Sequence, residues 1–179
     1  MPAPPVVVAS IKGGEIPMDE GSLSPPFLTK EVEEFLLDDI GMKNLLESVP
    51  LADVKADGFD AVFLPGGHGA CFDMPDEPRL IALLEQFAAS GKVVSAVCHG
   101  PMGLVNVKGP DGKPLVAGKK VTGFSDAEEY AVAKEKVVPF LLEARLRELG
   151  GLYESGDKWA PFAVRDGKLV TGPLRWGRK

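Results

Sequence analysis

The sequence predicts an α/β fold in which helices cover both faces of a mostly parallel β-sheet. Two observations carry this prediction. Short apolar runs bounded by turn residues alternate with helical patterns along the chain, and this alternation is the signature of βαβ units. The chain has 179 residues, of which 45% are hydrophobic, and this suits one domain with a sizeable core. We therefore expect residues 1–179 to form a single domain.

The first third of the chain combines a short strand with helices. Residues 6–9 are a β-branched run that predicts a strand, and the glycine turn at 12–14 leads into a proline-containing loop. Apolar residues recur at helical spacing from 30 to 47, where an acidic pair and a glycine at 38–41 predict a break. This third therefore predicts one strand, a long loop and two helical pieces.

The alternation is clearest in the middle of the chain. Apolar runs at 60–65 and 92–97 predict strands that are buried on both faces of a parallel sheet. Between them, Asp76 is expected to cap a helix that ends at Gly91. A tight turn after the second strand leads into a predicted helix at 102–107.

The last third continues the pattern. Residues 115–123 predict another strand, residues 127–150 are expected to be largely helical around Pro139, and residues 162–170 are typical of a β-hairpin. Ligands of parallel α/β sheets bind beyond the carboxyl ends of the strands. The loops that follow the strands are therefore where a functional site is expected.

Charge and composition exclude several classes of function. The net charge of −6 and the pI near 5.0 argue against a nucleic-acid-binding surface. No apolar run is long enough to cross a bilayer, and the N-terminal residues lack a signal-peptide pattern, so we expect a cytoplasmic protein that does not bind membranes. In a reducing compartment Cys71 and Cys98 are expected to stay free, and no cysteine or histidine spacing predicts a metal site.

Two loops that follow successive predicted strands carry the candidate chemistry. The second loop begins with Cys98, and a thiol at the start of a helix gains thiolate character from the free backbone amides there. His99 is the neighbouring base or acid for that thiol. The first loop offers glycine amides that can approach a substrate oxyanion, because no Cβ stands in the way. The expected substrate- or oxyanion-binding residues are Gly66, Gly67, His68 and Gly100.

Each of these residues also has a purely structural interpretation. Cys98 could be a small buried hydrophobic residue at a strand end, and inert packing is the better interpretation for Cys71. His99 could only cap or pack its turn. His68 could contact the substrate or hydrogen-bond within its own loop. The sequence context favours a reactive Cys98 and leaves the role of His68 open.

A carboxylate that orients a catalytic histidine is expected downstream of the second loop. Asp126, Glu128 and Glu129 follow a Gly-Phe-Ser segment and are the nearest candidates. Acidic residues are favoured in the first turn of any helix because they complement the helix dipole, so a solvated helix start is the alternative. The spacing does not choose among the three carboxylates.

Four segments in a fixed order combine into one pattern. They are LPGGHG at 64–69, AVCHGP at 96–101, VTGFSDAEE at 121–129 and LVTG at 169–172. With these segments the chain resembles the DJ-1/PfpI superfamily, whose domains are class I glutamine amidotransferase-like. Within it, the chain is most similar to the Hsp31-like glyoxalase III branch. The resemblance extends from about Val6 to Gly172.

The resemblance implies a flavodoxin-like three-layer α/β sandwich and a cofactor-free site in which Cys98, His99 and Glu129 form a triad. The implied activity is the glutathione-independent conversion of methylglyoxal, a small 2-oxoaldehyde, to D-lactate, which is the glyoxalase III or D-lactate dehydratase reaction. Members of the branch are also described as stress-related chaperones and as protein deglycases. The resemblance likewise implies a homodimer.

The chain departs from the family pattern at both ends. Relatives begin with a further strand and helix before the segment that matches Val6, and that unit supplies a glutamate that hydrogen-bonds the nucleophile. After Gly172 the family continues into a closing helix, whereas this sequence ends at Lys179. These departures predict a truncated gene product with weakened activity. They leave two alternatives: a stress-related chaperone or binding protein, and an amidotransferase- or peptidase-like hydrolase with the same cysteine turn.

Overall fold

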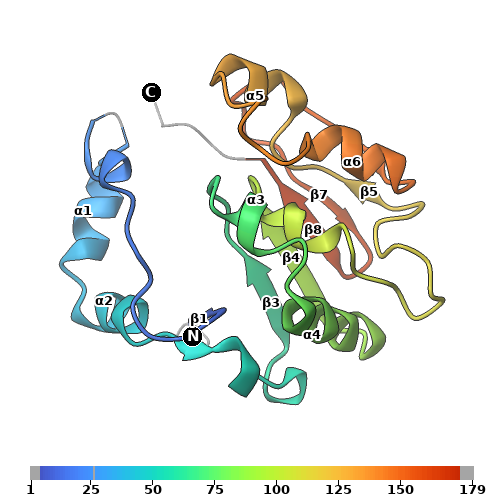
Figure 1. The fold of residues 1–179 in the computed structure, drawn as a ribbon. Coiled ribbons are helices and arrows are strands. Elements are labelled where there is room, and N and C mark those ends of the chain that lie inside the picture. The colour runs from blue at the N-terminus through green and yellow to red at the C-terminus, as the bar shows by residue number, and fades with distance from the viewer. Residues whose placement is uncertain (1–4, 26, 174–179) are drawn as a thin grey trace. The chain divides into compact units, whose positions relative to one another are not determined.

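The computed structural model describes residues 5–25 and 27–173 (Figure 1). The C-terminal departure from the family pattern, at 174–179, lies outside the described residues. The chain divides into two compact units, with the boundary between Val54 and Lys55. The expectation of one domain over residues 1–179 stays a prediction.

The N-terminal unit contains a small parallel sheet and two short helices. Strand β1 (Ala9–Ser10) pairs in parallel with β2 (Val49–Pro50). The helices are α1 (Lys30–Leu36) and α2 (Asp39–Leu46), and the 3₁₀ turns are η1 (Glu20–Leu23) and η2 (Leu51–Asp53). The Asp38 side chain accepts a hydrogen bond from the Ile40 amide at the start of α2, so the predicted break at 38–41 is a helix cap. The strand expected at 6–9 is shorter and lies later in the chain, at Ala9–Ser10, where β2 provides a partner.

The second unit is built on a four-stranded sheet of order β3-β4-β8-β7. The strands are β3 (Ala61–Leu64), β4 (Val93–Val97), β7 (Val164–Asp166) and β8 (Leu169–Gly172). Strands β3, β4 and β8 are parallel and lie side by side (Figure 1), whereas β7 forms the predicted hairpin with β8. The carboxyl ends of β3, β4 and β8 therefore meet at one edge of the sheet, and the predicted α/β class with a mostly parallel sheet is confirmed.

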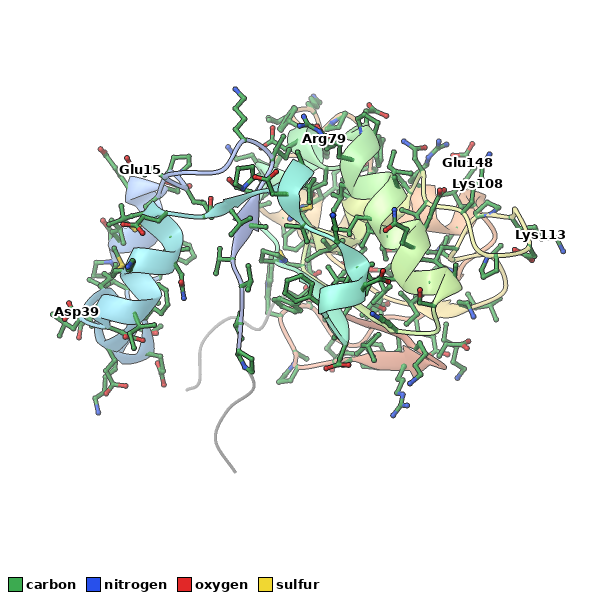
Figure 2. All side chains as sticks on the ribbon, turned by 90° about the horizontal axis from the view of Figure 1, so that it is seen from below. Glu15, Asp39, Arg79, Lys108, Lys113 and Glu148 are labelled. Carbon is green, nitrogen blue, oxygen red and sulfur yellow. The ribbon has the colours of Figure 1, made fainter. Side chains whose placement is uncertain are left out.

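Helices and a second pair of strands complete this unit. The helical elements are η3 (Ala56–Gly58), α3 (Ala70–Asp73), α4 (Pro78–Ala89), η4 (Gly100–Leu104), α5 (Asp126–Ala131) and α6 (Leu142–Glu148). Strands β5 (Lys120–Val121) and β6 (Leu152–Tyr153) pair in parallel. Helix α4 packs on β3 and β4 (Figure 1), with Leu84 and Phe87 in the core. Charged side chains such as Arg79, Lys113 and Glu148 are exposed and project outward (Figure 2).

The structure corrects two details of the central βαβ unit. The cap of α4 is Glu77, which accepts from the Arg79 amide, because the side chain of Asp76 accepts instead from the side-chain amide of Asn106. Strand β3 is buried on one face only, since the side chain of Phe63 is 61% exposed.

Three further elements differ from their predicted extent. The helix expected at 102–107 is the 3₁₀ turn η4, which begins earlier, at Gly100, and includes Pro101. The strand expected at 115–123 is shortened to β5, and the helical stretch at 127–150 is interrupted by turns around Pro139. Among the described helices, none combines the length and apolar character that a membrane crossing requires.

Candidate active site

Cys98 lies on a sharp turn directly after β4. Its φ angle of 60° is in the left-handed region, which costs a non-glycine residue about 1–3 kcal/mol unless its surroundings hold it there. Two backbone hydrogen bonds hold it: the Cys98 amide donates to the carbonyl of Gly172 (2.8 Å), and the Phe124 amide donates to the carbonyl of Cys98 (2.8 Å). The strained turn projects the thiol beyond the sheet edge, as in other nucleophile turns between a strand and a helix.

The glycine loop after β3 lies against this thiol. A methyl group at Gly66 would collide with the Cβ and Sγ of Cys98, so only glycine fits there. The backbone amide of Gly67 donates a hydrogen bond toward the Cys98 sulfur. A methyl group at Gly100 would collide with the carbonyl of Leu64, and this close packing explains the glycine at that position. The substrate- or oxyanion-binding roles of Gly66, Gly67 and Gly100 stay predictions.

The imidazole of His99 connects the thiol to a carboxylate. Its Nδ1 lies 3.4 Å from the Cys98 sulfur, and its Nε2 lies 2.7 Å from Oε2 of Glu129. The ring is fully buried and packs on Phe124, with centroids 4.3 Å apart. Because a carboxylate only accepts hydrogen bonds, Nε2 carries the ring hydrogen and the lone pair of Nδ1 faces the thiol.

Glu129 joins two imidazoles rather than one. Glu129 is 2% exposed, and its second carboxylate oxygen, Oε1, accepts a hydrogen bond from Nε2 of His68 (2.8 Å). The two histidine rings are 4.3 Å apart between centroids. This nitrogen of His68 therefore bonds to the carboxylate of the predicted triad rather than within its own loop.

The other two acidic candidates have different partners. Oε2 of Glu128 accepts from the amide and hydroxyl of Ser125 in a capping box, and its Oε1 accepts from the Trp159 amide. Oδ1 of Asp126 accepts from the amide of Ala144 at the start of α6. Of the three candidates, Glu129 is the one bonded to the imidazoles. The alternative of a solvated helix start is wrong, because Glu128 and Glu129 are both buried.

Burial controls the protonation of the pair Cys98 and His99. Desolvation raises the pKa of the Cys98 thiol, although hydrogen bonds from the Gly67 and His99 amides oppose the change. Desolvation also lowers the pKa of His99, although the hydrogen bond to Glu129 opposes it. The thiolate character expected from the helix start is therefore wrong in direction: the resting pair is a neutral thiol beside a neutral imidazole that can accept its proton.

The second cysteine is not part of this line of hydrogen bonds. Cys71 is free, 1% exposed and located on α3. Burial raises its pKa to about 12. It therefore stays a thiol at neutral pH, in keeping with the packing role expected for it.

Comparisons with known proteins decide the family. The model of the DJ-1/PfpI family matches residues 6–173. The chain belongs to the DJ-1/PfpI family. Glyoxalase 3 of Candida albicans is 32% identical over 170 residues, which cover 89% of this DJ-1/PfpI chain and 71% of the relative. The glutathione-independent glyoxalase HSP31 of Saccharomyces cerevisiae is 32% identical, over 89% of this chain and 70% of the relative.

Two solved structures that are similar to this DJ-1/PfpI chain agree with its fold. Rapid Encystment Protein 24 KDa of Francisella tularensis superposes with a TM-score of 0.88 at 36% identity, over 94% of this chain and 74% of that one. Glyoxalase III from Candida albicans superposes with a TM-score of 0.83 at 31% identity, over 94% of this chain and 73% of that one. The predicted resemblance to the glyoxalase III branch, with its flavodoxin-like fold, is confirmed.

The DJ-1/PfpI site also holds a donor set that the sequence did not predict. The ligand atoms of His68, His99 and Glu129 all lie within 4.8 Å of one another, close enough for small shifts to bring them onto one divalent cation. Sequence spacing contains no sign of it, because the three residues come from three separate elements. Phe124, which packs on the ring of His99, was also missed as a site residue, although it lies in the VTGFSDAEE segment at 121–129.

Proposed function

We propose that this protein is a cysteine-dependent glyoxalase that converts methylglyoxal to D-lactate without glutathione. The observation that carries the proposal is the continuous contact from the Cys98 sulfur through His99 to Glu129 at the carboxyl edge of the sheet. The names of the relatives, glutathione-independent glyoxalases among them, support the reaction class.

The reaction begins when Nδ1 of His99 takes the thiol proton while the sulfur of Cys98 bonds to the aldehyde carbon of methylglyoxal. The aldehyde oxygen takes up a proton and a hemithioacetal forms. A proton is then removed from that carbon and another is added to the neighbouring carbon, which gives a thioester of lactate. Water cleaves the thioester, releasing lactate and restoring the thiol, so that methylglyoxal and one water balance one lactic acid.

Glu129 supports this chemistry without contacting the substrate. Its negative charge stabilises the imidazolium that forms on His99, and its hydrogen bond fixes the tautomer whose Nδ1 faces the thiol. Because the resting thiol is neutral, the site depends on this proton transfer rather than on a permanent thiolate.

The test is to measure D-lactate formed from methylglyoxal by the purified protein without glutathione. We expect activity in the wild type and its loss in Cys98→Ser. The matched control is Cys71→Ser, which changes the other buried cysteine and is expected to retain activity. A folded wild-type protein that produces no D-lactate would contradict the proposal.

A second candidate function is binding of unfolded proteins, in keeping with a stress-related chaperone. The N-terminal unit exposes large apolar side chains, with Leu37 84%, Ile40 75% and Val6 72% exposed. Suppression of the heat-induced aggregation of a client enzyme that persists in Cys98→Ser would support this function. The absence of suppression at any ratio of protein to client would contradict this function. Equal suppression by a variant with Leu37 and Ile40 changed to serine would place the client-binding surface elsewhere.

Two further properties are proposed for this chain. A homodimer is supported by the edge of β3, which has no partner strand among the described residues of its sheet. A cytoplasmic location is supported by two free cysteines. Sedimentation velocity and cell fractionation test these two points.

A further inference from the structure

We propose that His68 is a positioning residue that holds Glu129 in register with His99, a role that rests on the proposed glyoxalase function. The carboxylate of Glu129 is almost completely buried, with its side chain 3% exposed. Each of its oxygens has one imidazole partner: Oε2 accepts from His99 and Oε1 from His68. The assembly is therefore an imidazole–carboxylate–imidazole bridge.

The bridge has a physical purpose because a glutamate side chain is long. Suppressing free rotation about its bonds costs conformational entropy, and one hydrogen bond at one oxygen leaves the carboxylate able to turn. A second hydrogen bond, at 2.8 Å from Nε2 of His68, fixes the plane of the carboxylate so that Oε2 faces His99. Without it, Oε1 would be a buried charged oxygen that has lost a strong donor.

The three members come from three different elements, so the bridge also ties the site together. His68 lies in the loop after β3, His99 follows β4, and Glu129 lies on α5. Phe124 packs beside both rings, with centroids 4.3 Å from His99 and 6.0 Å from His68. The bond between His68 and Glu129 therefore connects the glycine loop beside the thiol to the helix that carries the carboxylate.

Partial exposure of His68 distinguishes it from the rest of the bridge. Its side chain is 38% exposed, against 1% for His99 and 3% for Glu129. This exposure also allows the role expected from the sequence, direct contact with substrate. The two roles differ in what they change: positioning acts on the turnover number kcat, whereas a substrate contact acts on KM.

The test compares His68→Gln, whose side-chain amide can still donate to Glu129, with His68→Leu, which cannot. We expect His68→Leu to lower kcat by about 10- to 100-fold with KM within about threefold, a loss of the size seen when partners that orient metal-binding histidines are removed. We expect His68→Gln to keep kcat within about threefold of wild type. Asp73→Asn, which changes an exposed titratable residue close by in the chain, is the matched control and is expected to leave both constants unchanged.

Two outcomes overturn the proposal. A higher KM in both His68 variants with kcat intact assigns His68 to the substrate instead. Equal losses of kcat in both variants mean that the donated hydrogen bond is not what matters.

A readout independent of activity separates this proposal from the glyoxalase proposal. Nuclear magnetic resonance of isotope-labelled histidine reports the tautomer of the His99 ring directly. We expect the Nε2–H form in the wild type and in His68→Gln, and a mixture of tautomers or faster ring motion in His68→Leu. If the wild type makes no D-lactate but this pattern holds, the glyoxalase proposal fails and the bridge stands. An unchanged His99 signal in His68→Leu overturns the bridge itself.

Discussion

Replacing Glu129 by glutamine separates the orienting carboxylate from the fold. Glutamine keeps the size of the side chain but replaces one oxygen by an NH₂ group, which donates. If NH₂ faces His99, Nε2 must become the acceptor, and the ring hydrogen moves to Nδ1, where it faces the Cys98 sulfur. The imidazole can then no longer accept the thiol proton.

The expected magnitude follows from this change of tautomer. An amide in place of the orienting carboxylate of a serine protease lowers kcat by about 10⁴-fold through the wrong tautomer. We expect a fall of about 10³- to 10⁴-fold in Glu129→Gln, which corresponds to about 4–5.5 kcal/mol at 1.36 kcal/mol for each factor of ten. The assay is the initial rate of D-lactate formation from methylglyoxal at neutral pH.

Glu128→Gln provides the matched control. Glu128 is as buried as Glu129 and is its neighbour, but it bonds to Ser125 and Trp159 rather than to the imidazoles. Glutamine is also accepted at this position of a capping box, so we expect kcat within about threefold of wild type. A Glu129→Gln rate within about tenfold of wild type, or an equal loss in both variants, would refute the reasoning.

Four further results are expected. Alkylation of Cys98 by iodoacetamide rises with pH, and its midpoint lies above the usual cysteine pKa of about 8.5 because burial raises the pKa of this thiol. Cys71 stays unmodified in the folded protein. A midpoint below about 8.5 for Cys98 contradicts a neutral resting thiol. The free energy of unfolding falls as pH drops below about 6.5, because folding lowers the pKa of His99 and the unfolded state therefore binds the proton more readily. Urea titrations at several pH values, compared with the same titrations of His99→Asn, check the sign of this change. Gly66→Ala lowers activity, because the added methyl group displaces the Cys98 side chain, and a crystal structure with an unmoved sulfur contradicts this. Zinc ions inhibit D-lactate formation through the two imidazoles and the carboxylate, and a chelator restores the rate; inhibition that is unchanged in His68→Gln places the ion elsewhere.

The sequence was sufficient to locate the site because strand ends are readable. The apolar runs before Gly66 and Cys98 predicted parallel strands, and parallel strands place their carboxyl ends at one edge. The spacing from Ser125 to Glu128 is also a capping-box pattern, which assigns Glu128 to the start of its helix. This local pattern removes Glu128 from the three acidic candidates. It does not choose between Asp126 and Glu129.

Other features of the site depend on tertiary contacts and could not be predicted from local sequence patterns. The hydrogen bond between His68 and Glu129 joins a loop and a helix that are distant in the chain, so residue spacing does not predict it. The direction of the thiol pKa was wrong because a sequence shows that Cys98 begins a turn but not how completely the folded chain removes water from it.

The backbone hydrogen bond from the Cys98 amide to the Gly172 carbonyl determines when, during synthesis, the thiol can reach its folded position. The turn that carries the nucleophile is completed by β8, which lies far downstream in the chain. As the polypeptide leaves the ribosome, the cysteine emerges long before the strand that pins it, and pairing across so long a stretch is slow. Until residues 169–172 have been synthesised, the Cys98 amide lacks the carbonyl that it bonds in the folded protein, so the turn that positions the thiol is completed only after β8.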